Sequence, residues 1–155
     1  MGSLNDLSQR RKERKGIRMI LALIDSLRHA RRRRTWEHAR ATGRRGEDLA
    51  HRFLRREGYI VVARNYRLPS GDGKADIVAW ERDTLVIVEV KSRESADYGP
   101  PDRAIDPEKL RHMRRVALEY GRKTETPWER IRFDVVTVLL GDPPEMNLFR
   151  GVNGG

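Results

Sequence analysis

An apolar run that ends in two charged residues constrains this chain more than any other feature. Residues 85–88 (Leu-Val-Ile-Val) are continuously apolar, which is typical of a strand covered on both faces. Alternate residues of a strand share one face, so Ile87, Glu89 and Lys91 are expected on the same side. A charged pair in such surroundings loses solvation unless a partner or a bound metal compensates for it. The run therefore predicts a buried strand whose final residues carry chemistry.

A second predicted strand brings another acid beside this run. Residues 75–81 and 84–91 both have strand-like patterns, and two residues separate them, so a tight hairpin is the simplest connection. In a hairpin centred on that dipeptide, Asp76 faces Glu89. Directly opposed side chains have Cβ atoms roughly 4.5 to 5.5 Å apart. Two carboxylates at that distance require a proton or a cation, and Mg²⁺ suits such oxygen ligands.

The positive charge of the chain is concentrated in its first part. The formal net charge is +10 at pH 7, which is typical of nucleic-acid binders. Residues 1–45 carry this whole excess, because basic and acidic residues are equally numerous in residues 46–155. The absence of cysteine excludes disulfides and thiolate metal sites and fits a reducing cytoplasm, where we expect the protein. The four histidines lack metal-ligand spacing, so zinc is not expected.

Residues 1–42 form a basic extension for which an amphipathic helix is predicted. Four aliphatic residues within residues 20–27 follow the i, i+3, i+4, i+7 spacing of one helical face, between basic blocks at 9–15 and Arg31–Arg34. This apolar centre is too short to span a bilayer, and the cleavage region of a signal peptide is missing. We therefore expect neither integral membrane association nor secretion. Packing on the domain, pairing with a second copy, contact with anionic lipid or DNA, and a partly disordered extension all stay open.

The remaining residues, 43–155, have the pattern of one α/β domain. The expected elements are a helix at 43–57, a strand at 59–66, the hairpin, a loop at 92–105, a helix from Pro107 to near Gly121, a strand at 131–140 and an edge strand at 147–152. Asp106 is expected to cap the second helix, with Pro107 at its first position. This order predicts a mixed central sheet flanked by helices.

Glu47 is a further candidate because it shares a helical face with expected core residues. It precedes Ala50 by three positions and Leu54 by seven, which turns it toward the sheet. An acid in the first turn of a helix also stabilises the N-terminal dipole, so a purely structural role stays open.

A series of ordered motifs in residues 43–152 resembles the bacterial YraN-like family. The motifs are Gly43-x-x-Gly46-Glu47, Gly58-Tyr59, Arg64-Asn65-Tyr66-Arg67, Asp76-Ile77-Val78-Ala79, Val88-Glu89-Val90-Lys91-x-Arg93, Ala104-Ile105 with Lys109, and Arg132-Phe133-Asp134-Val135-Val136. The resemblance implies a relation to archaeal Holliday junction resolvases and a restriction-endonuclease-like α/β/α core. It also implies that the acid, then acid-x-lysine signature of such nucleases falls on Asp76, Glu89 and Lys91, with Glu47 as the helical acid.

The charges and the resemblance together predict a metal-dependent endonuclease that hydrolyses phosphodiester bonds in DNA, in branched or repair and recombination intermediates. Asp76, Glu89 and the backbone carbonyl of Val90 are the expected ligands of Mg²⁺ or Mn²⁺, with Glu47 as a further candidate. Lys91 is expected to orient the attacking water or to stabilise developing negative charge. No small-molecule cofactor is expected, and a homodimer would match a two-fold symmetric junction.

Basic residues near the site and in the extension are the candidates for phosphate contacts. They are Lys74, Arg93, Lys109, Arg111, Arg31, Arg32, Arg33 and Arg34. For those on the second helix, a solvated face is the structural alternative. Lys74 also departs from the family, which usually has Gly-Glu-Ile-Asp where this chain has Gly-Lys-Ala-Asp at residues 73–76. In the predicted hairpin Lys74 faces Lys91 and repels it; if the strand begins at Asp76, the change has no effect.

Two further functions stay open beside the endonuclease. Lys74 favours a binding module that keeps the fold and holds branched DNA or a repair partner without cutting it. The helix in the extension favours an interaction protein that self-associates or contacts a membrane surface, and whose nuclease-type site is vestigial.

Overall fold

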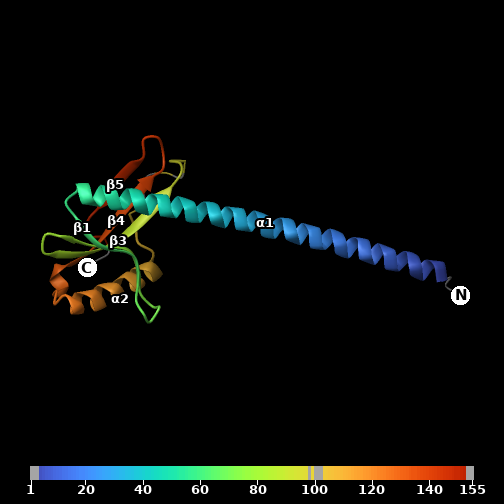
Figure 1. Cartoon of the computed structure of the whole chain (residues 1–155), viewed down its shortest axis with the longest axis horizontal. Helices are drawn as coiled ribbons and strands as arrows, with labels where there is room; N and C mark the ends of the chain where they lie inside the picture. Colours follow the sequence, from blue (N-terminus) through green and yellow to red (C-terminus); the bar gives the residue numbers. More distant parts are fainter. Residues whose placement is uncertain (1–3, 98, 100–102, 153–155) are drawn as a thin grey trace. The chain divides into compact units, whose positions relative to one another are not determined.

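The chain begins with one long helix that runs into an α/β domain. The computed structural model describes residues 4–97, 99 and 103–152, with side chains from residue 21 onward. Contacts divide the chain into two units, Met1–Ala41 and Thr42–Gly155. The helix α1 (Leu4–Arg56) has 53 residues and belongs to both units (Figure 1). The sequence predicted two separate helices here; they are continuous because residues 28–42 contain neither Pro nor Gly and are rich in Arg and Ala, which favour helix.

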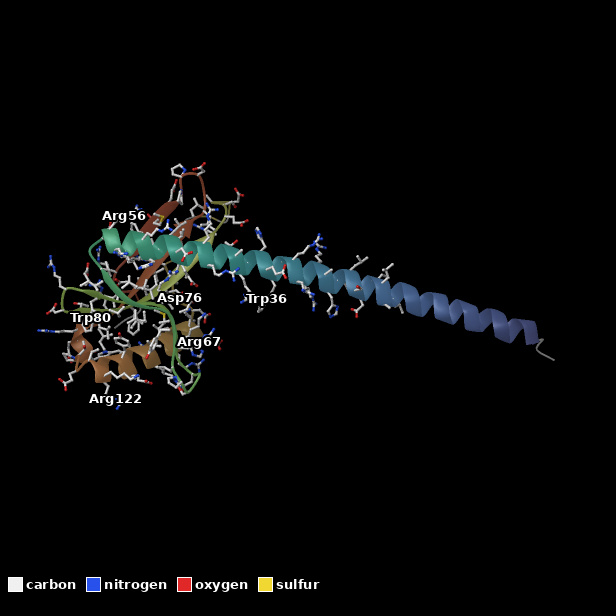
Figure 2. The ribbon with its side chains drawn as sticks, in the orientation of Figure 1. Trp36, Arg56, Arg67, Asp76, Trp80 and Arg122 are labelled. Carbon is white, nitrogen blue, oxygen red and sulfur yellow. The ribbon has the colours of Figure 1, made fainter. Side chains whose placement is uncertain are left out.

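The aliphatic stripe of α1 in the first unit is exposed. Leu23 and Leu27 each have 62% of their surface accessible, and Ile24 has 40%. Trp36 projects from the same helix and is also exposed, and the Arg40 guanidinium lies 5.9 Å from the centre of its ring (Figure 2). The described part of this segment is therefore helical, where the sequence left a disordered extension open. Within the described ranges, every helix is too short or too polar to span a bilayer.

Five strands form one mixed sheet in the second unit. In chain order, which is also their order in the sheet, they are β1 (Ile60–Arg67), β2 (Lys74–Glu81), β3 (Thr84–Arg93), β4 (Ile131–Leu139) and β5 (Glu145–Phe149). β3 and β4 pair in parallel, and the other neighbours are antiparallel. A parallel pair requires a crossover connection. The helix α2 (Pro107–Lys123) and a short 3-10 turn, η1 (Trp128–Arg130), supply it.

Helices cover both faces of the sheet and make a three-layer domain. On one face, α2 contributes Met113 to a core that contains Ile87 and Phe133. On the other face, the last turns of α1 contribute Leu54 to a core that contains Val86. Figure 1 shows α2 and the end of α1 on opposite sides of the sheet. The predicted alternation along β3 and the predicted α/β fold, with a mixed sheet flanked by helices, are confirmed.

Asp106 caps α2 as predicted. Its carboxylate accepts the backbone N–H of Lys109 at 3.3 Å, and a proline occupies the first turn. The helix ends at Lys123, beyond the predicted end near Gly121. Gly121 does not terminate the helix because its missing side chain serves packing: a Cβ atom there would lie 2.8 Å from the Ile131 side chain.

The hairpin register follows the prediction as far as Ile77 and Val88. β2 and β3 pair from their shared turn to that position. Beyond it, a side chain continues the connection, because Asp76 Oδ2 accepts the backbone N–H of Val90 at 3.0 Å. The end of β3 is therefore tied to β2 through a carboxylate.

Lys74 pairs with the other neighbour of its strand. It lies opposite Arg67 of β1. The predicted opposition of Lys74 and Lys91 is wrong, because the ladder between β2 and β3 ends before it reaches these positions. Lys74 therefore has a cationic residue, Arg67, as its partner in β1, on the opposite side of β2 from β3, which carries Lys91.

Candidate active site

Asp76 and Glu89 meet on the face of the sheet that α2 covers. Asp76 is 5% exposed, and the Glu89 side chain is 14% exposed. Lys109, in the first turn of α2, reaches between them. Its Nζ atom lies 3.0 Å from Asp76 Oδ1 and 2.7 Å from Glu89 Oε2. The buried carboxylate of Asp76 and the half-buried carboxylate of Glu89 therefore share one cation near the start of β2, where Figure 2 labels Asp76.

Burial and the shared cation set the acidity of these three groups. Burial, together with the charge of Asp76, raises the pKa of Glu89 to about 7. Burial also opposes ionisation of Asp76, yet the charge of Lys109 and the N–H of Val90 outweigh it and hold the pKa of Asp76 below its usual range. For Lys109, burial acts to lower the pKa, but the two carboxylates raise it overall. At neutral pH, Glu89 is thus poised between its protonation states.

Glu89 Oε2 is a buried acceptor without a well-formed hydrogen bond. It lies 2.7 Å from the Lys109 ammonium, but none of the described donors meets it with hydrogen-bond geometry. The Lys109 ammonium is therefore the cation that compensates this oxygen in the metal-free protein.

The donor set fits a hard divalent cation. Asp76 and Glu89 supply carboxylate oxygens. Val90, whose backbone carbonyl is the further predicted ligand, is the next residue after Glu89 in the sequence. One ammonium nitrogen already contacts both carboxylates, so a single cation can reach both. In the part of the chain that the structure describes, no group of three or more His, Cys, Asp or Glu side chains is placed to hold a metal. Mg²⁺ commonly takes one or two carboxylates and completes its shell with water and substrate phosphate.

Lys91 extends from β3 toward the loop that precedes α2. Its ammonium group donates a hydrogen bond to the carbonyl of Ala104. Strand alternation places it on the same face as Glu89, as the sequence predicted. Lys109, which the sequence assigned to phosphate contacts, is the lysine that bridges the two carboxylates.

Glu47 is held by Asn65, to which the sequence pattern gave no role, and among the described residues it does not join Asp76 and Glu89 in a metal-binding group. Asn65 Nδ2 donates to Glu47 Oε2 at 2.7 Å. Asn65 lies opposite Asp76 in the sheet, because the neighbouring pairs between β1 and β2 are Arg64 with Ile77 and Tyr66 with Ala75. Its φ of 48° is left-handed, a conformation that asparagine adopts more readily than most other residues. An asparagine inside a strand is itself uncommon, and that was the available signal.

The other predicted phosphate contacts lie at the surface. Arg111 is exposed on α2, and Arg93 and Lys74 are half-buried at the ends of β3 and β2. Arg31–Arg34 are exposed on α1 within the first unit. Lys109 is the member of this set that reaches the carboxylates.

A second buried polar cluster surrounds Asp134 on the opposite face of the sheet. The fully buried Asp134 carboxylate accepts from Arg132 at 2.8 Å, from Tyr59 at 2.9 Å and from the backbone of Gly151 at 3.0 Å. Arg132 also pairs with Glu81 at 2.6 Å. Burial, with the charge of Asp134, raises the pKa of Tyr59 to about 12. Both oxygens of Asp134 are satisfied from within the protein, which indicates a structural role.

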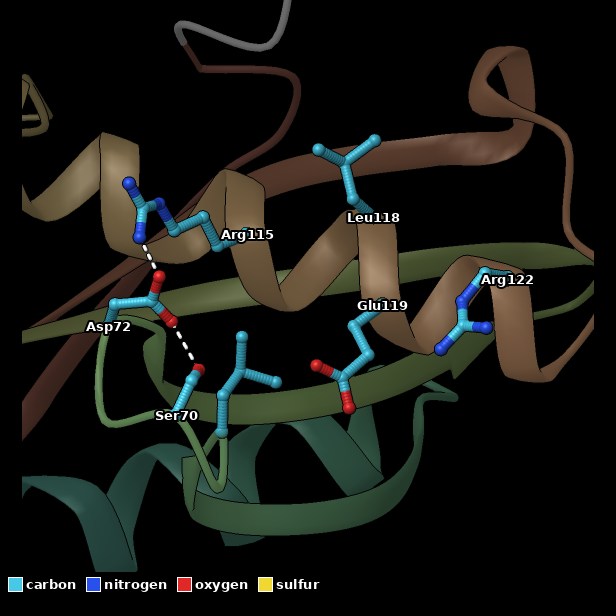
Figure 3. Close-up of a pocket in the computed structure, with 7 residues that line it drawn as sticks. Ser70, Asp72, Arg115, Leu118, Glu119 and Arg122 are labelled. Carbon is cyan, nitrogen blue, oxygen red and sulfur yellow. Dashed lines mark hydrogen bonds and ion pairs between the residues drawn. The ribbon is translucent and has the colours of Figure 1, made fainter.

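A surface hollow of about 670 Å³ lies between α2 and the loop that joins β1 to β2. Figure 3 shows that Asp72 accepts a hydrogen bond from Ser70 and forms an ion pair with Arg115. Leu118 adds an exposed apolar side chain. The hollow does not include the carboxylates of Asp76 and Glu89, and the ion pair between Asp72 and Arg115 joins the loop to the helix.

Comparison with known proteins assigns the chain to a family. Residues 46–138 match the uncharacterised protein family UPF0102. The chain is 46% identical over 133 residues to a UPF0102 protein of Solibacter usitatus (strain Ellin6076), a match that covers 86% of this chain and 98% of that protein. A UPF0102 protein of Koribacter versatilis (strain Ellin345) is 44% identical over 117 residues, 74% of this chain and 79% of the relative. One from Rhodococcus opacus (strain B4) is 43% identical over 108 residues, 70% and 90% of the two chains. The chain therefore belongs to the UPF0102 family, the YraN-like family that its motifs predicted.

Proposed function

We propose that the domain of residues 42–155 hydrolyses phosphodiester bonds in nucleic acid, with Mg²⁺ or Mn²⁺ held by Asp76 and Glu89. The observation that carries this proposal is the pair of carboxylates, one buried and one half-buried, that lie 3.0 and 2.7 Å from the single cation Lys109 Nζ. Gathering two acids in a partly buried site costs stability unless a cation compensates. Strongly shifted pKa values of this kind are concentrated at functional sites.

The carboxylates would hold the metal, and their surroundings keep them in place. A divalent cation bound there would activate water and neutralise the charge that develops on the phosphate. The N–H of Val90 fixes Asp76 through Oδ2, so Oδ1 is the oxygen turned to the site. Lys91, on the face of Glu89, would orient the attacking water or stabilise negative charge. Asn65 holds the Glu47 side chain through a hydrogen bond, and a role of Glu47 as a further ligand stays a prediction.

DNA is the substrate class that charge and family resemblance favour. The chain carries a net charge of +10, concentrated in residues 1–45. The relation to Holliday junction resolvases that the motifs imply favours branched DNA.

Substitution of Arg31–Arg34 tests whether the first unit contributes to DNA binding. Changing all four to Gln should reduce the salt dependence of DNA binding, by about 0.9 in the log–log slope for each phosphate that these arginines neutralise. An unchanged slope would exclude phosphate binding by these residues.

A cleavage assay on branched and linear DNA, with Mg²⁺ and with Mn²⁺, tests the proposal. Asp76→Asn and Glu89→Gln remove a carboxylate each and should lower the cleavage rate at least about 100-fold, the usual scale for loss of a key electrostatic group. The matched control is Asp83→Asn, which neutralises an exposed acid at the hairpin turn. Circular dichroism verifies that the variants fold. Cleavage by both site variants at the wild-type rate would refute the assignment.

A nucleic-acid-binding module that does not cut is the second candidate. Lys109 favours it, because an internal ammonium already neutralises the carboxylates. Such a module would bind branched DNA equally well in EDTA and in Mg²⁺, and would yield no product with either metal. The nuclease should instead bind DNA more tightly once metal compensates the acids.

A further inference from the structure

Lys109 is anchored at its backbone, while its charged tip can change partners. Asp106 caps α2 and accepts the N–H of Lys109, so the helix fixes the position of the Cα atom. The charge is carried at the end of a flexible four-carbon stem. The side chain is 22% exposed, so one side of it faces solvent. The ammonium can therefore leave the carboxylates without any movement of α2.

Charge balance decides what happens when a divalent cation enters this site. Without metal, Asp76 and Glu89 share the single positive charge of Lys109. A divalent cation neutralises both carboxylates by itself. The ammonium would then be an excess positive charge within a few ångströms of the metal, in a partly buried site where screening is weak. Metal and ammonium therefore compete for the same two carboxylates.

We propose that Lys109 is an internal counterion, which a metal ion displaces and which then binds a phosphate group of the nucleic acid. This inference rests on the proposed function and adds a role for a residue outside the carboxylate pair. A displaced ammonium beside a metal site needs an anion, and the substrate phosphate is the anion that the reaction brings there. Metal and nucleic acid consequently bind with positive coupling. The metal releases the Lys109 ammonium for the phosphate, and the phosphate neutralises the ammonium that would otherwise repel the metal.

Calorimetric titration of the full chain with Mn²⁺, without nucleic acid, tests the counterion role. Lys109→Gln and Lys109→Met both remove the competing charge, and the second keeps an apolar stem for packing. Both should bind Mn²⁺ at least about tenfold more tightly than the wild type, within the usual range of such couplings. The matched control is Lys123→Gln, which removes one charge from the last turn of the same helix, where Lys123 pairs with Glu119. It should bind Mn²⁺ like the wild type.

A second titration measures the coupling between metal and nucleic acid. It uses a branched duplex with phosphorothioate linkages, which slow cleavage during the measurement. Saturating duplex should raise the Mn²⁺ affinity of the wild type at least about fivefold. The gain should be smaller in both Lys109 variants, because they have no ammonium to transfer to the phosphate.

The outcomes separate this inference from the proposed function. If the Lys109 variants bind Mn²⁺ no more tightly than the wild type, the counterion role is overturned and the metal site stands. If neither the wild type nor any variant binds Mn²⁺, the proposed function fails and the inference fails with it. Thermal unfolding at the titration conditions verifies that each variant is folded.

Discussion

Gly46 in α1 approaches Ser92 in β3 so closely that a Cβ atom on Gly46 would overlap the Cβ and Oγ atoms of Ser92. The Ser92 hydroxyl also donates to the carbonyl of Thr42, 3.4 Å away in the same stretch of helix. Glu47 follows Gly46, and Lys91 precedes Ser92. The close approach therefore sets the distance between helix and strand beside two candidate site residues.

Replacing Gly46 by Ala should lower the free energy of unfolding by about 1 to 3 kcal/mol, the usual cost of overpacking. Alanine favours helix more than glycine does, so any decrease reports the overlap with Ser92 and not the helix propensity. Ser92→Gly removes both overlapping atoms, so the same change should cost much less in that background. Urea unfolding of the wild type, the two single variants and the double variant completes a double-mutant cycle. Equal decreases in both backgrounds would show that the overlap does not matter.

The acidity of Glu89 should make the stability of the metal-free protein depend on pH. Burial and Asp76 raise its pKa to about 7 from an ordinary value of 4.5. Between these values the native state holds a proton that the unfolded state has released, so the free energy of unfolding should fall as the pH rises through this window. The free energy of unfolding of Glu89→Gln should not fall in this way. Its advantage over the wild type should therefore be largest at pH values above the window. Urea unfolding in EDTA measures both curves, and parallel curves would contradict the shift.

Lys74 should weaken the sheet through Arg67, which lies opposite it in β1. Lys74→Glu places an acid opposite Arg67 and should raise the free energy of unfolding by about 0.2 to 1 kcal/mol, the usual scale of cross-strand charge pairs. Adding Arg67→Glu to that variant should abolish the gain. If the gain instead survives with both acids, repulsion from Arg67 is not its cause.

Much of the fold could be predicted because local rules decide it. The two-residue turn and the alternation of β3 fixed the hairpin register as far as Ile77 and Val88, and the Asp-Pro start of α2 fixed its cap. The two apolar patterns of this region predict two helices, and α1 is continuous because the arginine-rich segment between them is itself helix-forming. The register beyond Val88 was missed because a side chain, Asp76, replaces the backbone ladder there.

The two acids of the site could be predicted from the sequence, but the cation that pairs with them could not. Strand geometry alone brought Asp76 and Glu89 together and required a compensating charge. That this charge comes from Lys109 depends on how α2 packs over the sheet, a tertiary contact that no spacing in the sequence encodes. The contact of Asn65 is unpredictable for a similar reason. Its hydrogen bond to Glu47 joins β1 to α1, and its left-handed backbone departs from the regular strand that the pattern predicts.

Asp134 should matter for stability and not for metal binding. Asp134→Ala removes the acceptor for Arg132 and Tyr59 and should lower the free energy of unfolding by about 3 to 5 kcal/mol, the usual cost of breaking a buried ion pair. Asp134→Asn keeps an acceptor and should be less destabilised. Both variants, where folded, should bind Mn²⁺ like the wild type. A large decrease of Mn²⁺ affinity in folded Asp134→Asn would instead place this cluster in the active site.

Diffraction from crystals saturated with Mn²⁺, measured at the manganese absorption edge, tests the central claim most directly. The account predicts an anomalous peak between the carboxylates of Asp76 and Glu89, with the Lys109 ammonium moved away from both. Crystals of Asp76→Asn should lack the peak. If Mn²⁺-saturated crystals of the wild type show no peak at this position, and Lys109 still bridges the two carboxylates, the claim that they form a metal site is contradicted.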